Sequence, residues 1–371
     1  MALSDGRARW AAAAAAAKEL NRIEDVAARY GVALRRSGHE LVGLSPIKPE
    51  KTPSFYVDPR KQVFKCFASG EGGDVIALVQ AVEGGTFADA LKILGAETID
   101  PATLERLRKQ SEAKRVEIER EDRISKARKI ELARGIWRAA RPAEGTIVET
   151  YLRARRVDLD AIRELYGFTV PPTLRFHPGL DYEHDGVTHH GPAMVGGLYD
   201  YKSESLCGVH RTWLLADGSG KAKLPKPKKA LGVLMGSLAP LTPERTNAVL
   251  GEGYETVLSV VGMLARERRP VAAWSANSLG NLAGAGLGRG RPHPQIEGKR
   301  LGSIIPDPER PGIVLPSCIR TLTLLADADG DIPSTEALME RAEAKYMAAG
   351  KEVSTAWPPV GQDFNDMVMA A

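Results

Sequence analysis

A short apolar segment that ends in three alternating aspartates constrains the fold of this chain more than any other feature. The segment runs from Leu322 to Ala326, and Asp327, Asp329 and Asp331 follow it directly. An apolar run of this length is typical of a buried strand in a parallel sheet, and ligands bind at the carboxyl ends of such strands. Three carboxylates in one turn repel one another, and a divalent cation would relieve that repulsion. Because all the candidate ligand atoms are oxygens, the pattern favours Mg2+ or Mn2+.

Two further acidic turns have the same form. The apolar segment Ala248–Leu250 leads into a glycine-rich turn that contains Glu252, and the apolar stretch behind this turn predicts a helix. The glycines allow a tight backbone turn that leaves Glu252 at the edge of the sheet. The last acidic turn of the chain contains Asp363 and Asp366. Each turn alone could be a solvated loop end, but three of them after strands predict carboxylates that converge on one metal cluster.

Taken together, these motifs resemble a Toprim domain, the metal-binding domain of DnaG-type primases, topoisomerases and some nucleases. The resemblance rests on Gly-Glu-Gly-Tyr-Glu-Thr around Glu252, on Asp327-x-Asp329, and on Asp-Phe-Asn-Asp from Asp363 to Asp366. Their order is most similar to primases of phages and mobile elements. The resemblance implies that Glu252, Asp327 and Asp329 are catalytic and bind metal. The further metal-binding residues that it implies are Asp331, Asp363 and Asp366.

The chain is long enough for two or three domains, and its charge is unevenly distributed. Its 371 residues are too many for one ordinary hydrophobic core. The net charge of +4 does not by itself indicate a polyanionic partner, but residues 105–141 hold 13 Lys and Arg against 7 Asp and Glu. Residues 327–371 have an excess of Asp and Glu. The pattern predicts one basic region and an acidic, metal-binding end.

Cysteine usage favours a reducing compartment. Cys66, Cys207 and Cys318 lie far apart, and no pair has the spacing of metal ligands. An odd number of distant cysteines provides no disulfide framework, so a cytoplasmic protein is expected. No apolar stretch reaches the roughly 18 residues of a membrane span, and the alanine-rich run Ala11–Ala17 predicts a helix.

In the first hundred residues, short segments of alternating apolar and polar residues are separated by turn residues. This pattern predicts a small antiparallel sheet, accompanied by helices. These residues resemble the N-terminal zinc-binding domain of DnaG-type primases in the stretches 43–48, 50–55, 65–70 and 72–76. That family places Cys, His, Cys and Cys where this chain has Ser45, Lys48, Cys66 and Ser69. A structural zinc needs four nitrogen or sulfur ligands. We therefore predict the fold without zinc. If zinc were bound, His39 would be the nearest candidate for a further ligand.

Aromatic side chains of this first region allow two interpretations. Phe55, Tyr56, Phe64 and Phe67 lie on predicted strands, where alternate positions face a core. Some of them could instead stack on single-stranded bases, with phosphates near basic side chains. The basic side chains concerned are Lys51, Arg60, Lys61 and Lys65.

A basic segment precedes the metal-binding region. It interleaves lysines with Pro225 and Pro227, which hold the backbone extended. It is either a solvated loop or a basic ridge for a triphosphate or a template. Arg175–Pro178 and His210–Leu214, followed by this segment, resemble the region that precedes the Toprim domain in mobile-element primases, which favours the ridge. The candidate residues for binding nucleic acid or NTP are Arg211, Lys221, Lys223, Lys226 and Lys65.

The expected fold class is α+β and α/β multidomain. A small zinc-finger-like antiparallel sheet with helices is followed by a primase core that ends in a Toprim, Rossmann-like parallel sheet. The expected parts are a zinc-finger-like domain over residues 1–100, a charged helical linker over 101–145, a mixed α/β core subdomain with the basic ridge over 146–245, and a Toprim catalytic domain over 246–371.

The resemblance implies a DNA primase-like nucleotidyltransferase, a DNA-directed RNA polymerase that makes short RNA primers on single-stranded DNA with Mg2+ or Mn2+. Its expected partners are a single-stranded DNA template and NTPs, with a replicative helicase or a single-strand-binding protein as further candidates and no membrane. Two alternatives remain open. One is a Toprim metal-dependent nuclease, and the other is a non-catalytic module that binds DNA or a replication protein.

Overall fold

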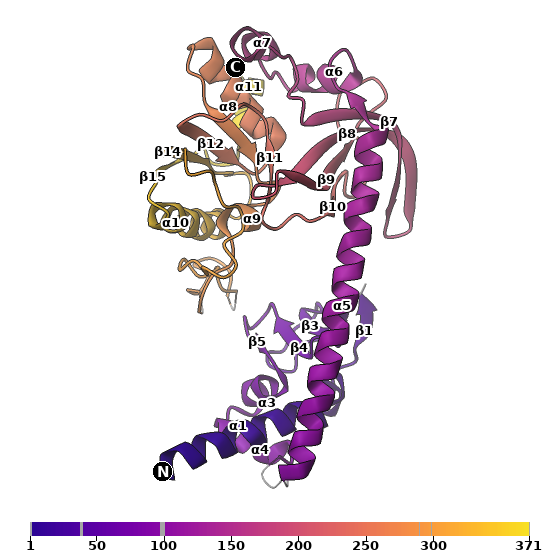
Figure 1. The fold of residues 1–371 in the computed structure, drawn as a ribbon, viewed down its shortest axis with the longest axis vertical. Helices are drawn as coiled ribbons and strands as arrows, with labels where there is room; N and C mark the ends of the chain where they lie inside the picture. Colours follow the sequence, from indigo (N-terminus) through magenta and orange to yellow (C-terminus); the bar gives the residue numbers. More distant parts are fainter. Residues whose placement is uncertain (1, 38–39, 97–100, 289, 298, 371) are drawn as a thin grey trace. The chain divides into compact units, whose positions relative to one another are not determined.

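The computed structural model describes residues 2–37, 40–96, 101–288, 290–297 and 299–370 (Figure 1). The chain divides into two compact units, Met1–Arg123 with Pro292–Arg300, and Ile124–Arg291 with Leu301–Ala371. Each unit has hydrophobic clusters of its own. Within the ranges given above, no helix is both long enough and apolar enough to cross a membrane.

The first unit is built on a 5-stranded antiparallel sheet, with β1 to β5 side by side in chain order. Its elements are α1 (Ala2–Leu20), α2 (Ile23–Arg29), β1 (Arg35–Ser37), β2 (Glu40–Gly43), β3 (Phe55–Asp58), β4 (Val63–Cys66), β5 (Gly72–Gly73), α3 (Val75–Glu83) and α4 (Phe87–Ile93). The predicted antiparallel sheet is thus present. Helix α5 (Pro101–Ala139) follows and runs on into the second unit.

Local signals explain where these helices begin and end. Asp74 is the N-cap of α3, and its side chain accepts hydrogen bonds from the N–H groups of Ile76 and Ala77. Thr86 and Asp89 form a reciprocal capping box at the start of α4. Gly31, with a φ of 79°, follows α2.

The aromatic side chains on or next to β3 and β4 divide between the core and the outer side of the sheet. Phe55 and Phe64 are buried and stack with ring centroids 5.3 Å apart, so both belong to the core. Tyr56 and Phe67 lie on the outer side, where their rings meet edge to face at 5.4 Å and Phe67 is 54% exposed. Lys65 places its Nζ 4.5 Å from the Phe67 ring centroid. Strand alternation therefore leaves an aromatic and basic patch on the outer side.

The second unit contains a larger mixed sheet of 10 strands, in which β10-β9-β8-β11-β13-β12-β14-β15 are successive neighbours. Strand β7 pairs with β8 and with the short β6. Its strands are β6 (Arg141–Pro142), β7 (Leu174–His184), β8 (Val187–Asp200), β9 (Ser205–Trp213), β10 (Lys228–Gly232), β11 (Ser237–Pro240), β12 (Asn247–Gly251), β13 (Ala272–Ser275), β14 (Thr321–Leu325) and β15 (Glu352–Ala356). Its other helices are α6 (Ile147–Ala154), α7 (Leu159–Tyr166), α8 (Tyr254–Arg266), α9 (Leu279–Ala283), α10 (Ile332–Ala348) and α11 (Phe364–Ala370).

Four neighbouring strands, β13, β12, β14 and β15, run parallel to one another. The chain leaves β12 through α8 to reach β13 on one side, and it leaves β14 through α10 to reach β15 on the other side. The two helices pack in different clusters, since Val257 of α8 belongs to one core and Met339 of α10 to another. The strand order therefore reverses between β12 and β14, and ligands of open α/β sheets bind at such a point.

Strands β9 and β10 direct neighbouring basic residues to opposite faces of the sheet. Lys228 pairs with Thr212, and Lys229 pairs with Arg211. Because side chains alternate along a strand, Lys228 lies on one face while Lys229 and Arg211 share the other.

Candidate active site

A polar cavity of about 290 Å³ lies where the strand order reverses in the second unit. Glu252 directly follows β12, and Asp327 and Asp329 follow β14. The side chains and backbone that line the cavity belong to Arg155, Lys221, Lys228, Glu252, Gly253, Glu255, Thr256, Asp327, Asp329 and Asp363. Four predicted site carboxylates, those of Glu252, Asp327, Asp329 and Asp363, thus share one cavity.

Negative charge is poorly compensated on the carboxylate side of this cavity. Burial, with the neighbouring carboxylates of Glu252, Asp363 and Asp329, raises the pKa of Asp327 to about 7. Burial also raises the pKa of Glu252, with Lys228 opposing the shift and Asp329 adding to it. Asp327 Oδ1 is buried and has no hydrogen-bond partner among the described residues.

These observations fit a divalent cation. An orphaned carboxylate oxygen beside further carboxylates offers the hard oxygen donors that Mg2+ and Mn2+ prefer. In the described part of the chain, however, no three His, Cys, Asp or Glu side chains surround one point as a ready metal site. The carboxylates share the cavity without yet converging on a single position.

The opposite side of the cavity is cationic and surrounds a buried carboxylate. Glu255 accepts a hydrogen bond of 2.6 Å from the Tyr151 hydroxyl and one of 3.0 Å from Lys228 Nζ. Lys221 Nζ lies 3.4 Å from the same carboxylate. Although burial alone would raise it, the two lysines hold the pKa of Glu255 well below its usual range. Burial lowers the pKa of Lys221, whereas the Glu255 ion pair outweighs burial and raises the pKa of Lys228.

Helix α11 positions two residues that line the cavity, Asp363 and Arg155. Asp363 Oδ1 accepts the N–H of Asp366, and Asp366 Oδ2 accepts the N–H of Asp363, which caps the helix. The buried side chain of Asn365 donates to the carbonyl of Arg155 at 2.7 Å and to Ser259 Oγ at 2.9 Å. This amide joins α11 to the backbone of Arg155, which lines the cavity.

Several residues predicted for the site lie outside this cavity. Asp331 caps α10 through Ser334, and Asp366 caps α11. Lys223 and Lys226 are exposed beside the cavity-lining Lys221. Lys65 belongs to the first unit, on the outer side of β4.

Arg155, Glu255 and Tyr151 were not predicted as site residues, and Lys228 was predicted only as one lysine of the basic segment. Lys228 could have been separated from Lys229 by strand alternation, had β10 been predicted. Tyr151 and Glu255 are 104 residues apart in the chain, and no local pattern connects them.

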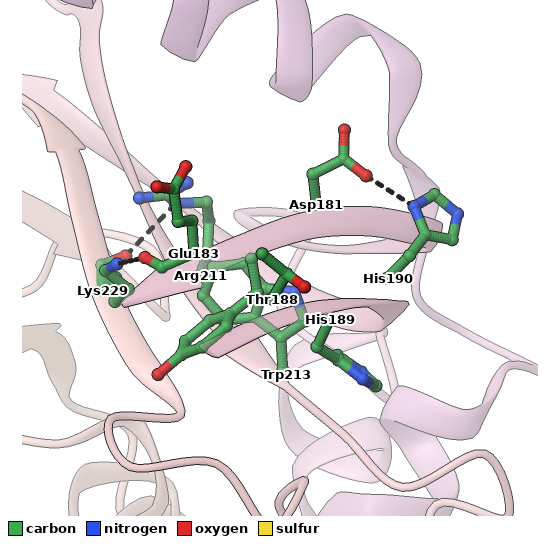
Figure 2. Close-up of a pocket in the computed structure, with 9 residues that line it drawn as sticks. Asp181, Glu183, Thr188, His189, His190, Arg211, Trp213 and Lys229 are labelled. Carbon is green, nitrogen blue, oxygen red and sulfur yellow. Dashed lines mark hydrogen bonds and ion pairs between the residues drawn. The ribbon is translucent and has the colours of Figure 1, made fainter. Parts of the chain in front are cut away.

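Arg211 lines a second, open cavity of about 740 Å³ on the other face of the β7–β10 sheet (Figure 2). Its guanidinium lies 5.2 Å from the Trp213 ring centroid, and Lys229 Nζ lies 5.0 Å from that of Tyr182. At the other end, Asp181 and His190 form a 2.7 Å contact (Figure 2). Arg211 therefore does not reach the acidic cavity with Lys221.

In the first unit, hydrogen bonds are made by the residues at the positions where the zinc-finger family has metal ligands. The buried thiol of Cys66 donates to Ser45 Oγ at 3.1 Å, and Ser69 Oγ accepts the N–H of Glu71. Glu50 organises the loop, since its carboxylate accepts the N–H groups of Ser45 and Ser54 at 2.8 and 2.9 Å. His39 lies outside the described residues.

Two family models match the chain. Residues 11–109 match the CHC2 zinc finger of DnaG primases, and residues 127–241 match a domain of unknown function, DUF7146. Residues 11–109 are therefore similar to the CHC2 zinc-finger domain of DnaG primases. The match to a zinc finger favours a metal in this domain, whereas the side chains at the ligand positions disfavour it.

The curated relatives that match part of this chain are DNA primases. The DNA primase of Mycolicibacterium smegmatis is 51% identical over 81 residues, which cover 22% of this chain and 13% of that protein. The DNA primase of Geobacillus stearothermophilus is 45% identical over 75 residues, which cover 20% of this chain and 12% of that protein. The chain thus matches about an eighth of the length of these relatives.

Solved primase structures are distant matches. The zinc-binding and RNA polymerase domains of the Aquifex aeolicus primase match with a TM-score of 0.36 and 18% identity, covering 95% of this chain and 81% of that one. A DnaG primase catalytic domain bound to single-stranded DNA matches with a TM-score of 0.37 and 13% identity, covering 67% of this chain and 77% of that one.

Proposed function

We propose that this chain, which begins with a CHC2 zinc-finger-type domain of the DnaG primase kind, is a primase-like nucleotidyltransferase that makes short RNA primers on single-stranded DNA. The observation that carries the proposal is the cavity at the carboxyl ends of β12 and β14, where four carboxylates face Lys221, Lys228 and Arg155. A cavity with an acidic and a basic side suits metal-dependent transfer of a nucleotide from a triphosphate. The chain carries this cavity behind a domain type that it shares with DNA primases.

The parallel strands β12 to β15 support a Toprim catalytic domain over residues 246–371 as part of this proposal. Residues 1–100 would be the zinc-finger-like domain, 101–145 the helical linker, and 146–245 the core subdomain. The expected partners are a single-stranded DNA template and NTPs, with a replicative helicase or a single-strand-binding protein as further candidates.

The carboxylates have distinct proposed roles. Glu252, Asp327 and Asp329 would hold Mg2+ or Mn2+, with Asp363 beside them. A bound divalent ion would supply charge neutralisation for the triphosphate and a lower pKa for the attacking hydroxyl. Asp327 has an unpartnered oxygen that suits a metal ligand, and Glu252 would be a further ligand or a proton acceptor. The opposite lysines would attract the phosphates and orient them.

A priming assay tests this proposal. Full-length protein is incubated with a single-stranded DNA template, labelled NTPs and either Mg2+ or Mn2+, and short RNA products are resolved. Asp327→Ala and Glu252→Gln should each reduce primer synthesis by roughly a hundred-fold or more, because each removes a group proposed to stabilise the transition state. Their circular dichroism spectra should match that of the wild-type protein.

Glu267→Gln is the matched control, because this exposed carboxylate pairs with Arg269 beyond the end of α8. It should keep full activity. If Asp327→Ala primes as well as the wild-type protein, the site assignment is wrong. Nicking of DNA without NTPs would identify the nuclease alternative, and DNA binding without either reaction would identify the non-catalytic one.

A further inference from the structure

Glu255 is a cavity carboxylate that we have not assigned to metal binding. It lies in the first turn of α8, and its side chain is 4% exposed. Lys228 Nζ at 3.0 Å and Lys221 Nζ at 3.4 Å contact its two oxygens. Tyr151, itself fully buried on α6, fixes the carboxylate with a hydrogen bond of 2.6 Å. One buried carboxylate therefore holds two ammonium groups in the cavity wall.

Charge on this wall exceeds what Glu255 neutralises. Lys221 and Lys228 are each about one third exposed, so each keeps donors that face the cavity. Arg155 lines the same cavity, and its buried Nε has no hydrogen-bond partner among the described residues. Three cations with one dedicated buried counter-ion suit a ligand with several negative charges, such as a polyphosphate chain.

The geometry points to Glu255 as a positioning residue for triphosphate: together with Tyr151 it holds Lys221 and Lys228, and these lysines, with Arg155, bind the β- and γ-phosphates of the incoming nucleotide. The identity of the ligand rests on the proposed function. Without the shared carboxylate, two ammonium groups this close would repel one another, and one of them would lose its proton or turn away. Glu255 thereby keeps both lysines charged and in place.

Nucleotide binding by full-length protein tests the inference. Titration calorimetry with Mg2+ present compares ATP with AMP, which lacks the β- and γ-phosphates. Lys221→Met and Lys228→Met should each weaken ATP binding by roughly ten-fold, since each removes a charge-assisted contact, and should change AMP binding by less than about two-fold. Lys229→Met is the matched control, because the next residue along β10 faces the opposite side of the sheet. It should change neither affinity.

The pH profile tests the positioning role directly. Between pH 7 and 9 the wild-type affinity for ATP should stay nearly constant. In Glu255→Gln it should fall by about ten-fold as the pH rises, because one of two uncompensated lysines then deprotonates. The charged and titratable groups that act on these lysines are Glu255, Arg155 and the buried His210, with Glu252 and Asp327 across the cavity from Lys228, and Tyr151 holds Glu255. If Glu255→Gln does not fold, Tyr151→Phe should shift the profile in the same direction to a smaller extent.

A structural role alone would lower ATP and AMP binding equally and leave the ATP profile flat, and that result would overturn the inference. The outcome is separable from the proposed function. If ATP binding depends on Glu255 but the protein makes no primers, the inference holds and the proposed function fails. Primer synthesis with an unchanged profile in Glu255→Gln would sustain the proposed function alone.

Discussion

The pKa of Asp327 depends on burial and on the other carboxylates of the cavity. Its ordinary pKa of 3.8 is raised to about 7 by burial and by the carboxylates of Glu252, Asp363 and Asp329. The folded protein therefore binds a proton there that the unfolded chain releases between pH 4 and 7. In this window the unfolded state holds fewer protons, so the free energy of unfolding falls as pH rises.

Asp327→Asn should remove this part of the pH dependence. In the presence of a chelator, the variant should lose less stability than the wild-type protein between pH 5 and 8, by on the order of 2 kcal/mol after allowance for solvent screening. Urea unfolding of both proteins at the two pH values measures the difference. Equal losses in the two proteins would contradict the proposed crowding of charge.

The lysines of the basic segment should differ in function, because some face the acidic cavity and others face solvent. Lys223 and Lys226 are exposed, whereas Lys221 lines the acidic cavity. Replacing Lys223 and Lys226 together by Met should leave the affinity for ATP unchanged. It should reduce the salt dependence of single-stranded DNA binding, because exposed lysines that bind phosphates displace counter-ions from the DNA. Fluorescence anisotropy at several salt concentrations measures the slope. An unchanged slope would show that these two lysines belong to a solvated loop that does not bind DNA.

At the scale of elements, the loop between β2 and β3 shows how a zinc-finger-type domain can be held by hydrogen bonds. Glu50 accepts three of them, two from the N–H groups of Ser45 and Ser54 and one of 2.5 Å from the Ser54 hydroxyl. The Cys66 thiol joins the same network through Ser45. The carboxylate thus ties both ends of the loop to the strand that carries Cys66.

Glu50→Ala should destabilise the first unit by on the order of 2 kcal/mol, because it leaves these donors without their acceptor. Thermal unfolding followed by circular dichroism measures the loss, and Lys51→Ala, an exposed change in the same loop, is the control. Elemental analysis of untagged protein tests the zinc prediction separately. One tightly bound zinc per chain, or a melting temperature that collapses in chelator, would show that other ligands are recruited, which the family match favours.

At the scale of the whole molecule, separate cores predict separate unfolding. The core of the first unit includes Phe55 and Leu78, and those of the second unit include Tyr151 and Leu324, with no residue in common. Calorimetry should show two transitions. Mg2+ with ATP should raise only the transition of the second unit, since a ligand stabilises the part that binds it. Glu50→Ala should lower only the other, and a single transition that both treatments shift would contradict this division.

The sequence by itself determined several of the elements and the acidic half of the cavity. The apolar run before Asp327 forms a strand because its hydrophobic pattern is local. Carboxylates that follow two parallel strands meet at one sheet edge wherever those strands are neighbours, so Glu252 and Asp327 could be paired in advance.

Only the tertiary structure decided the basic half. Which lysine reaches the cavity depends on the pairing of β10 with β9, and a shift of one residue would exchange Lys228 for Lys229. The partnership of Tyr151 with Glu255 joins helices that are distant in the chain, and it exists because α6 and α8 pack in one core. Local propensity carries no information on such contacts, because they depend on which surfaces the folded sheet brings together.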